Sequence, residues 1–186
     1  MKKILITSFA LVALPAISST TPYLGIGLGY QQLSTDIKVD SLSISDVAAN
    51  GVASVLMLGA RKNISDDYFL STEVNYLMSD ADFSVSVNGT TEKIEIDRSY
   101  GLSIHLGKRF SNDDINIYAK LGYQKDKFTY FNESINYNSF RFGLGSQFSV
   151  DEKLKLGIEW TAAQYQKKED IKPFGTLFLV TASYNF

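Results

Sequence analysis

Four charged side chains occupy positions where this 186-residue sequence could do chemistry. Glu73 and Glu159 are acids, Lys120 and Arg141 are bases, and each lies on the polar face of a segment that alternates apolar and polar residues. Paired carboxylates can serve as general acid and base. Charges enclosed by protein, however, must be paired to be tolerated. We therefore predict that the four form an interior salt-bridge network with a structural role. The alternative is a gate whose pairs rearrange to open a narrow pore.

The single histidine offers a second possible chemistry. His105 lies two residues from Ser103, and Glu73 is an acid on a comparable polar face. Serine, histidine and a carboxylate are the members of a hydrolase triad. We expect instead that His105 is a hydrogen-bonded interior residue, because the face that carries it points away from any lipid substrate. The predicted protein is not an enzyme and has no catalytic residue.

Other sequence features exclude several classes of site. Residues 25–29 read GIGLG, but a phosphate-binding loop needs a following helix, and these glycines lie within a strand pattern. The chain has no cysteine, which excludes thiolate metal ligands and disulfides. Its formal charge of -2 argues against nucleic-acid binding. We predict no cofactor and no metal.

The last twelve residues define the element type on which the fold depends. From Gly175 to Phe186, apolar side chains recur at every second position, and the chain ends on an aromatic residue. An alternating strand of about ten residues suits a transmembrane β-strand. The segment resembles the terminal strand of bacterial outer-membrane barrels, which the barrel-assembly machinery reads. That resemblance implies a membrane sorting signal at Tyr184 and Phe186.

Seven earlier segments share this alternation. Their apolar faces are at Leu24–Tyr30, Val52–Ala60, Tyr68–Met78, Tyr100–Phe110, Ile115–Tyr123, Phe140–Phe148 and Leu154–Ala162. No charged residue lies in the middle of these faces, where a lipid-facing Lys or Arg would cost roughly 2–4 kcal/mol. Aromatic residues gather near the ends of the segments, as expected where rings meet the membrane interfaces. The pattern therefore predicts eight membrane-spanning strands.

The connections predict how these strands are joined. Short polar connections at 63–67, 111–114 and 149–152 alternate with long ones at 33–50, 79–97, 127–138 and 166–174. Short turns on one side and long loops on the other are typical of transmembrane barrels. The predicted fold is all-β, an eight-stranded antiparallel up-and-down transmembrane β-barrel with both termini periplasmic. Asn88-Gly89 lies between two alternating runs and predicts a protruding hairpin, with a bulge near Ser79–Asp82.

The amino-terminal segment differs from the rest of the chain. Lys2 and Lys3 precede an apolar run from Ile4 to Ile17, and small residues follow. This arrangement predicts a secretory signal peptide over residues 1–20 and a barrel domain over residues 21–186.

Two stretches resemble a known family. Ser139–Phe148 reads SFRFGLGSQF and, with the closing Tyr184-Asn185-Phe186, resembles the OmpX/Ail type. That type belongs to the wider outer-membrane barrel superfamily, which includes opacity-like porins and the OmpA transmembrane domain. The resemblance implies a monomeric Gram-negative surface protein with a structural, adhesion or interaction role carried by its extracellular loops. Expected partners are outer-membrane lipids, lipopolysaccharide and host or surface ligands. The alternatives are a narrow porin-like channel and a lipid A-modifying enzyme.

Overall fold

The computed structural model describes residues 20–39, 42–87, 90–110, 114–130, 133–166 and 173–186. Within these residues the secondary structure consists of strands, and no helix is long and apolar enough to cross a membrane. The strands are β1 (Thr20–Val39), β2 (Leu42–Asn63), β3 (Tyr68–Ser79), β4 (Asp82–Val87), β5 (Thr90–Phe110), β6 (Ile115–Tyr130), β7 (Glu133–Ser149), β8 (Leu154–Tyr165) and β9 (Phe174–Asn185). The predicted signal peptide lies outside the described residues except for Thr20, which begins β1.

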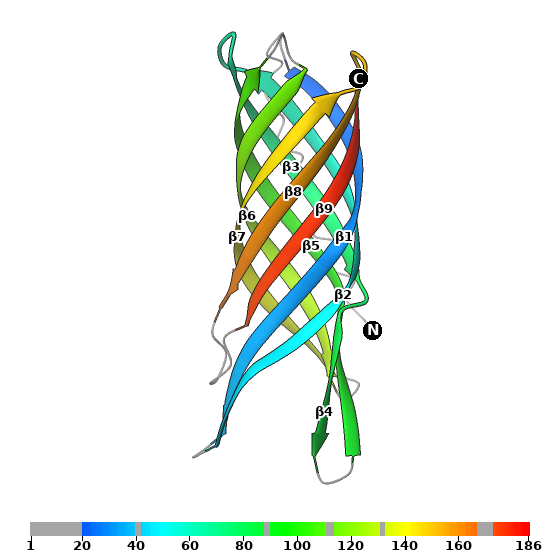
Figure 1. Cartoon of the computed structure of the whole chain (residues 1–186), viewed down its shortest axis with the longest axis vertical. Helices are drawn as coiled ribbons and strands as arrows, with labels where there is room; N and C mark the ends of the chain where they lie inside the picture. The colour runs from blue at the N-terminus through cyan, green and yellow to red at the C-terminus, as the bar shows by residue number, and fades with distance from the viewer. Residues whose placement is uncertain (1–19, 40–41, 88–89, 111–113, 131–132, 167–172) are drawn as a thin grey trace, which may run out of the picture.

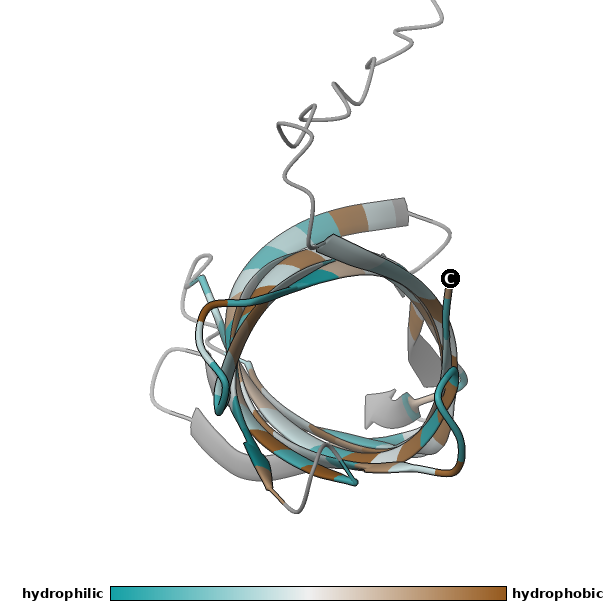
Figure 2. Cartoon of the chain, turned by 90° about the horizontal axis from the view of Figure 1, so that it is seen from above, coloured by the Kyte–Doolittle hydropathy of each residue, from teal (hydrophilic) through white to brown (hydrophobic). Residues whose placement is uncertain are grey.

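The strands close into a barrel (Figures 1 and 2). Each strand pairs antiparallel with the next along the chain, except that β3 and β4 both pair with β2 and β5 instead of with each other, and β1 also pairs with β9, which closes the ring. Strand β4 continues β3 along the same partner, β5, so the two segments form one stave of the wall. The result is a closed eight-stranded antiparallel barrel, which confirms the predicted fold class.

The register of the pairs sets the tilt of the strands. A path perpendicular to the strands starts at Gln31 and returns to β1 at Thr21, ten residues earlier. Between these ends it passes through Leu177, Thr161, Gly143, Lys120, His105, Ser71 and Arg61. A shear of this size in an eight-stranded barrel corresponds to a tilt of about 35–45° and an interior that side chains just fill.

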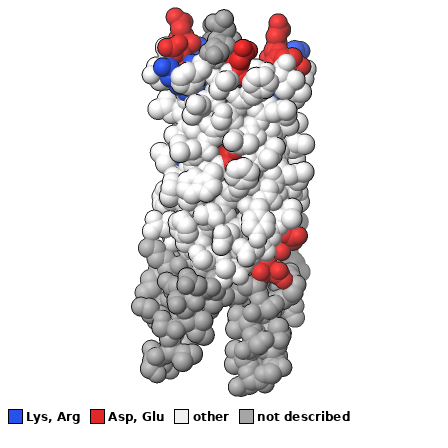
Figure 3. Space-filling view, viewed as in Figure 1, with Lys and Arg blue, Asp and Glu red and all other residues white. Residues whose placement is uncertain are grey.

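The outer wall is apolar over its middle. The exposed side chains there include Leu28, Leu58, Leu121 and Phe140, each at least 60% exposed. In the view of Figure 3 the middle of the barrel is almost free of charged side chains, and Lys, Arg, Asp and Glu gather at the end that carries the short turns. The predicted apolar outward face is confirmed.

The strands run further than the sequence pattern indicated. We predicted long connections at 33–50 and 127–138, but β1 and β2 continue to Val39 and Leu42, and β6 and β7 to Tyr130 and Glu133. The β1–β2 extension pairs Ile37 with Ile44. β-Branched residues favour the extended backbone, which explains why the ladder persists past the apolar band.

The predicted bulge is confirmed at the junction of β3 and β4. Met78 pairs with Arg98 and Asp82 with Glu95, so three residues on one side of the ladder oppose two on the other. A second irregularity follows on β5, where Asp97 is inserted between Ile96 and Arg98 relative to β6. Beyond these bulges the β4–β5 pair protrudes from the barrel wall (Figure 1). The predicted turn at Asn88-Gly89 lies outside the described residues.

Inside the barrel, aromatic rings lie over glycines of the adjacent strand. Tyr23 pairs with Gly59, Phe69 with Gly107 and Tyr118 with Gly145. A Cβ on any of these glycines would come within 2.3 Å of the ring, so only glycine fits there. The arrangement lets large rings lie flat against the wall of a narrow lumen, and it fixes where the hydroxyl groups of Tyr23 and Tyr118 point.

Candidate functional site

The lumen is crossed by a lysine held between two carboxylates. The Lys120 Nζ of β6 lies 3.0 Å from Glu73 Oε1 on β3 and 2.8 Å from Glu159 Oε1 on β8. All three side chains are buried. Because β3 and β8 are four strands apart in either direction around the ring, the two carboxylates come from opposite walls. Lys120 joins them through the middle of the barrel.

Each carboxylate also accepts a hydrogen bond from a tyrosine. Tyr23 Oη donates to Glu73 Oε2 at 3.0 Å, and Tyr118 Oη donates to Glu159 Oε2 at 2.9 Å. These are the rings that lie over Gly59 and Gly145. The two oxygens of each carboxylate thus have separate donors, one lysine and one tyrosine, which offsets the cost of burying the charges.

A second cation lies nearer the short turns. Arg61 Nη2 donates to Gln147 Oε1 at 2.6 Å, and its guanidinium lies 4.4 Å from the centre of the Phe69 ring and 5.9 Å from that of Tyr23. Arg61 directly follows the outward-facing Ala60 and so falls on the polar face, but the predicted interior network did not include it.

Arg141 does not join the other three predicted network residues. Its Nη2 lies 3.6 Å from Asp126 Oδ1, in a separate polar cluster toward the protruding extensions. Asp126 is fully buried and accepts hydrogen bonds from Ser99, Ser139 and Gln124. The sequence reading missed Asp126 because it ended the strand at Tyr123. Continuing the alternation three residues further would have placed Asp126 inside.

Two apolar clusters also lie in the described interior. One buried cluster lies on β2, β3 and β9, and a second lies toward the extensions. The first contains Ala53, Val55, Met57, Leu77, Leu177 and Leu179, and the second Leu33, Ala49, Ala81, Ile96, Phe128, Ala163 and Tyr165. In the second, the Phe128, Tyr137 and Tyr165 rings meet edge to face. The lumen is therefore built of polar and apolar layers.

His105 lies close to both possible triad partners but in the wrong arrangement. Its Nε2 is 3.1 Å from Ser103 Oγ and 3.8 Å from Glu73 Oε1. In a hydrolase triad the serine and the acid contact different ring nitrogens, so that the acid fixes the tautomer that accepts the serine proton. Here both face the same nitrogen, and the ring is buried and stacked on Tyr118 with centroids 5.0 Å apart.

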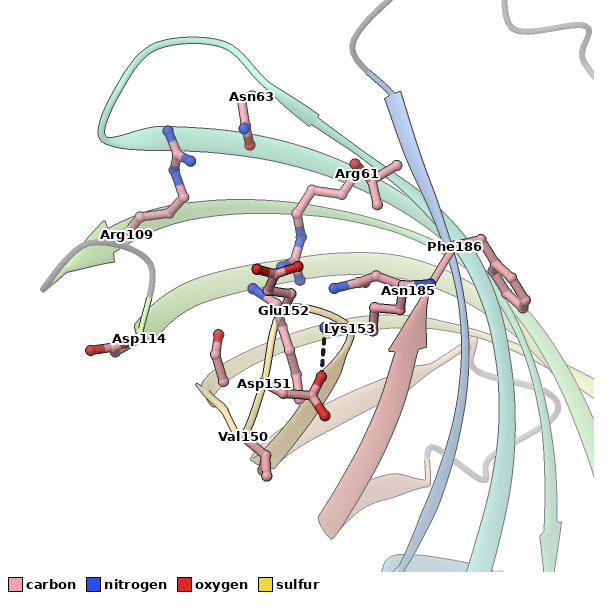
Figure 4. A pocket seen from close by; sticks show the side chains of 13 residues that line it. Arg61, Asn63, Arg109, Asp114, Val150, Asp151, Glu152, Lys153, Asn185 and Phe186 are labelled. Atoms are coloured by element: carbon pink, nitrogen blue, oxygen red, sulfur yellow. Dashed lines mark hydrogen bonds between the residues drawn. The ribbon is translucent and has the colours of Figure 1, made fainter.

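A cavity of about 680 Å³ opens at the end that carries the short turns (Figure 4). Cations and anions both line it, among them Arg61, Lys155, Asp151 and Glu152. Asp151 Oδ1 accepts hydrogen bonds from the backbone N–H groups of Lys153 and Leu154, each at 2.7 Å. These bonds stabilise the carboxylate and lower the pKa of Asp151. Among the described residues, no group of three acidic or histidine side chains is placed to hold a metal ion.

The two residues of the predicted sorting signal lie together on the outer face. Tyr184 and Phe186 are exposed, and their rings meet edge to face with centroids 5.3 Å apart. The Phe186 backbone N–H donates to the Pro22 carbonyl at 3.0 Å, which holds the chain end against β1.

The chain is similar to several solved outer-membrane barrels. Neisserial surface protein A is 16% identical over 89% of this chain and 97% of its own, with a TM-score of 0.60. Ail, the attachment invasion locus protein of Yersinia pestis, is 19% identical over 88% and 98% of the two chains, with a TM-score of 0.48. The outer membrane protease OmpT of Escherichia coli is 10% identical over 91% and 97%, with a TM-score of 0.44.

The similarity to Neisserial surface protein A shows a shared fold, and a fold does not fix a function. Comparison with curated protein sequences finds no significant match. The model of the outer membrane protein beta-barrel domain, however, matches residues 4–186, nearly the whole chain. Together with the closed barrel and its apolar outer wall, that match identifies this chain as a member of the outer membrane protein β-barrel domain family.

Proposed function

We propose that this chain is a small, monomeric outer-membrane protein with a structural, adhesion or surface-interaction role. Residues 1–20 act as its signal peptide, and residues 21–186 form the barrel. Both termini and the short turns face the periplasm, and the strand extensions face outward. Tyr184 and Phe186 guide insertion by the barrel-assembly machinery. The interior charges Glu73, Lys120, Arg141 and Glu159 serve stability and carry no catalysis.

The observation that carries the proposal is the crossing of the lumen by Lys120. Its contacts to Glu73 and Glu159 join opposite walls, and the rings of Tyr23 and Tyr118 lie beside them. A solute arriving from outside would meet the extensions before it met this layer. A role in surface interaction therefore suits the molecule better than one in transport.

The charge of the β4–β5 extension indicates what kind of partner it would attract. Residues 80–97 contain five acidic residues and one lysine. Clustered charge of one sign favours encounter with partners of the opposite sign. We therefore expect this extension to interact with a host or surface ligand that carries positive charge.

Shortening the extension tests the proposal. In the test variant, residues 84–93 are replaced by Asn-Gly and Asp82 and Glu95 by their amides, which removes three of the five acidic residues and retains the pairing of position 82 with 95 and of Phe83 with Ile94. Bacteria producing the wild-type chain should adhere to a cultured epithelial monolayer and to one another more than bacteria lacking it, and the shortened variant should lose most of this effect. Heat-modifiable migration on gels would verify that both barrels fold. Equal adherence of all three strains would contradict the proposed role.

A narrow channel is the second candidate. The cavity of about 680 Å³ extends into the barrel from the turn side as far as Arg61 and Lys155. Rearrangement of the Lys120 contacts would then be needed to connect it with the other end.

A further inference from the structure

The cavity at the short-turn end has a positive floor and a negative mouth. Arg61 on β2 and Lys155 on β8 line it, and each is only 9% exposed. Asp114, Asp151 and Glu152 line it too, but they belong to the turns and are exposed. The lining therefore changes sign between the inner and the outer part of one cavity of about 680 Å³ (Figure 4).

Two further basic residues line the cavity, but other groups hold their charged ends. Arg109 Nη2 donates hydrogen bonds to two backbone carbonyls of the turn between β2 and β3. Lys153 Nζ lies 5.8 Å from the centre of the Tyr184 ring, which is exposed on the outer face of the barrel. The positive charge that faces the cavity therefore comes mainly from the two inner residues.

Arg61 forms the floor because it crosses the lumen. Its Nη2 donates to Gln147 Oε1 at 2.6 Å, and β2 and β7 are four strands apart in either direction around the ring. The centre of the Phe69 ring lies 4.4 Å from the guanidinium carbon, so the ring supports one face of the group. Gln147 pairs with Gly157, and Lys155 is the next inward residue on that strand, so both cations lie in one layer. A fixed guanidinium beside an ammonium group suits a carboxylate.

A buried amide in this floor lacks a hydrogen-bond partner. Asn116 is fully buried and pairs in the sheet with both Arg109 and Gln147, and neither its Oδ1 nor its Nδ2 has a partner among the described residues. Buried amides are nearly always satisfied. A carboxylate that accepts the Nη2 hydrogen bond of Arg61 releases Gln147 Oε1, which can then accept one from Asn116 Nδ2 on the adjacent strand. Binding thus removes an unfavourable feature of the free protein.

We propose that this cavity binds a short peptide that has a free carboxyl and a free amino group. The carboxylate contacts Arg61 and Lys155, and the ammonium group lies among the acidic side chains of the mouth. An anion without a positive group gains only from the floor and is opposed by the mouth. The volume is in the range of small-molecule sites. The cavity is at the end opposite the extensions, so this site does not depend on the role proposed for them.

NMR titration of the isotope-labelled full chain in detergent micelles tests the site. The probes are trialanine, its carboxy-terminal amide and its amino-terminal acetyl derivative. Trialanine should shift the backbone amide signals of cavity residues such as Lys153 and Asn185. Either modification should weaken binding by about tenfold, the loss of one charge-assisted contact. Absence of shifts with millimolar trialanine, or binding of either derivative as tightly as trialanine itself, would overturn the proposal.

Two variants assign the ends of the peptide. Lys155→Gln should weaken binding of trialanine about tenfold and leave binding of its amide unchanged, because both changes remove the same contact. Glu152→Gln should likewise weaken binding of trialanine but not of its acetyl derivative. Lys125→Gln, at an exposed position toward the other end of the barrel, is the matched control and should bind all three peptides as the wild type does. Heat-modifiable migration would verify that each variant is folded. Wild-type affinity of the folded Lys155→Gln chain for trialanine would contradict the proposed site.

Discussion

Lys120 on β6 and Glu159 on β8 meet at 2.8 Å across the strand that separates them, with β7 represented at that level by Gly143 and Gly145. β7 has no room for a side chain at either position, and a Cβ at 143 would lie 2.5 Å from the backbone carbonyl oxygen of Trp160. The Cβ of a residue at 145 would lie 2.3 Å from the Tyr118 ring, whose hydroxyl also donates to Glu159. The Tyr118 ring needs the space left by Gly145, and the buried carboxylate of Glu159 accepts a hydrogen bond from that ring, so the glycine and the buried charge depend on each other.

Replacing Lys120 by Met should destabilise the barrel strongly. The substitution leaves the carboxylates of Glu73 and Glu159 buried without their shared cation. Breaking a buried ion pair from one side costs about 3–5 kcal/mol. Urea unfolding of the chain in lipid vesicles, followed by tryptophan fluorescence, would measure the change. Lys125→Met, at an exposed position, is the control and should change the free energy of unfolding by less than about 0.5 kcal/mol.

A triple variant separates charge from packing. Adding Glu73→Gln and Glu159→Gln to Lys120→Met removes the unpaired charges while it keeps side chains of similar size. We expect it to recover much of the lost stability. If the single and triple variants were equally unstable, the contribution of Lys120 would lie in packing rather than in charge.

The alternation of residues predicted the barrel because the physics that imposes it is local. A strand between lipid and lumen must alternate, so Leu121 and Lys120 fall on opposite faces whatever the partner strands are. Which interior charges meet depends on shear, which no single segment encodes. Glu73 and Glu159 both contact Lys120, whereas Arg141 contacts Asp126. Asp126 lies three residues beyond Tyr123, where the apolar pattern ended the predicted strand.

The extensions were harder to predict for a related reason. Beyond the membrane both faces of a strand can be polar, so the alternation that marks a spanning segment fades. The pairing of Thr35 with Val47 and of Ile37 with Ile44 depends on the β-propensity of these residues. It also depends on the register that β1 and β2 already have in the barrel wall. The bulges at the β3–β4 junction and at Asp97 then decide which side chains face outward.

Gly145→Ala should destabilise the barrel through the Tyr118 ring. The new Cβ would lie 2.3 Å from that ring, and moving the ring would disturb the hydrogen bond from Tyr118 to Glu159. Overpacking of this kind costs about 1–3 kcal/mol. Gly175→Ala is the matched control, since its Cβ would have ordinary contacts of 3.4 Å or more. Equal unfolding midpoints for the two variants in urea would show that the ring yields without penalty.

The wild-type chain should give no steady conductance in planar lipid bilayers. The lumen is crossed by the contacts of Lys120, and apolar clusters fill the layers toward the extensions. Reproducible conductance steps, altered by Glu159→Gln or Arg141→Gln, would support the narrow channel instead. A protein-free bilayer and heat-denatured chain serve as controls for leaks caused by detergent.

Lipid A from cells with and without the chain should have the same mass spectrum. His105 faces Ser103 and Glu73 through one nitrogen and is buried in the lumen, so the three residues lack the arrangement that activates a serine. The spectrum should also be unchanged by His105→Ala. A mass shift that appears with the wild-type chain and disappears with His105→Ala would reveal a lipid A-modifying activity.

The short turn at Asp151 should contribute stability that depends on pH. Hydrogen bonds from the backbone N–H groups of Lys153 and Leu154 lower the pKa of Asp151 in the folded chain relative to the unfolded chain. A lowered pKa means that the contribution is complete above the unfolded value of about 4 and is lost as pH falls through the folded value. The difference in unfolding midpoint between the wild-type chain and Asp151→Asn should therefore shrink as pH is lowered from neutral toward 3. Glu152→Gln changes the charge of the same turn without touching these two bonds, so its midpoint difference should not follow that profile. A difference for Asp151→Asn that stayed constant over this pH range would show that the folded turn does not favour the ionised carboxylate.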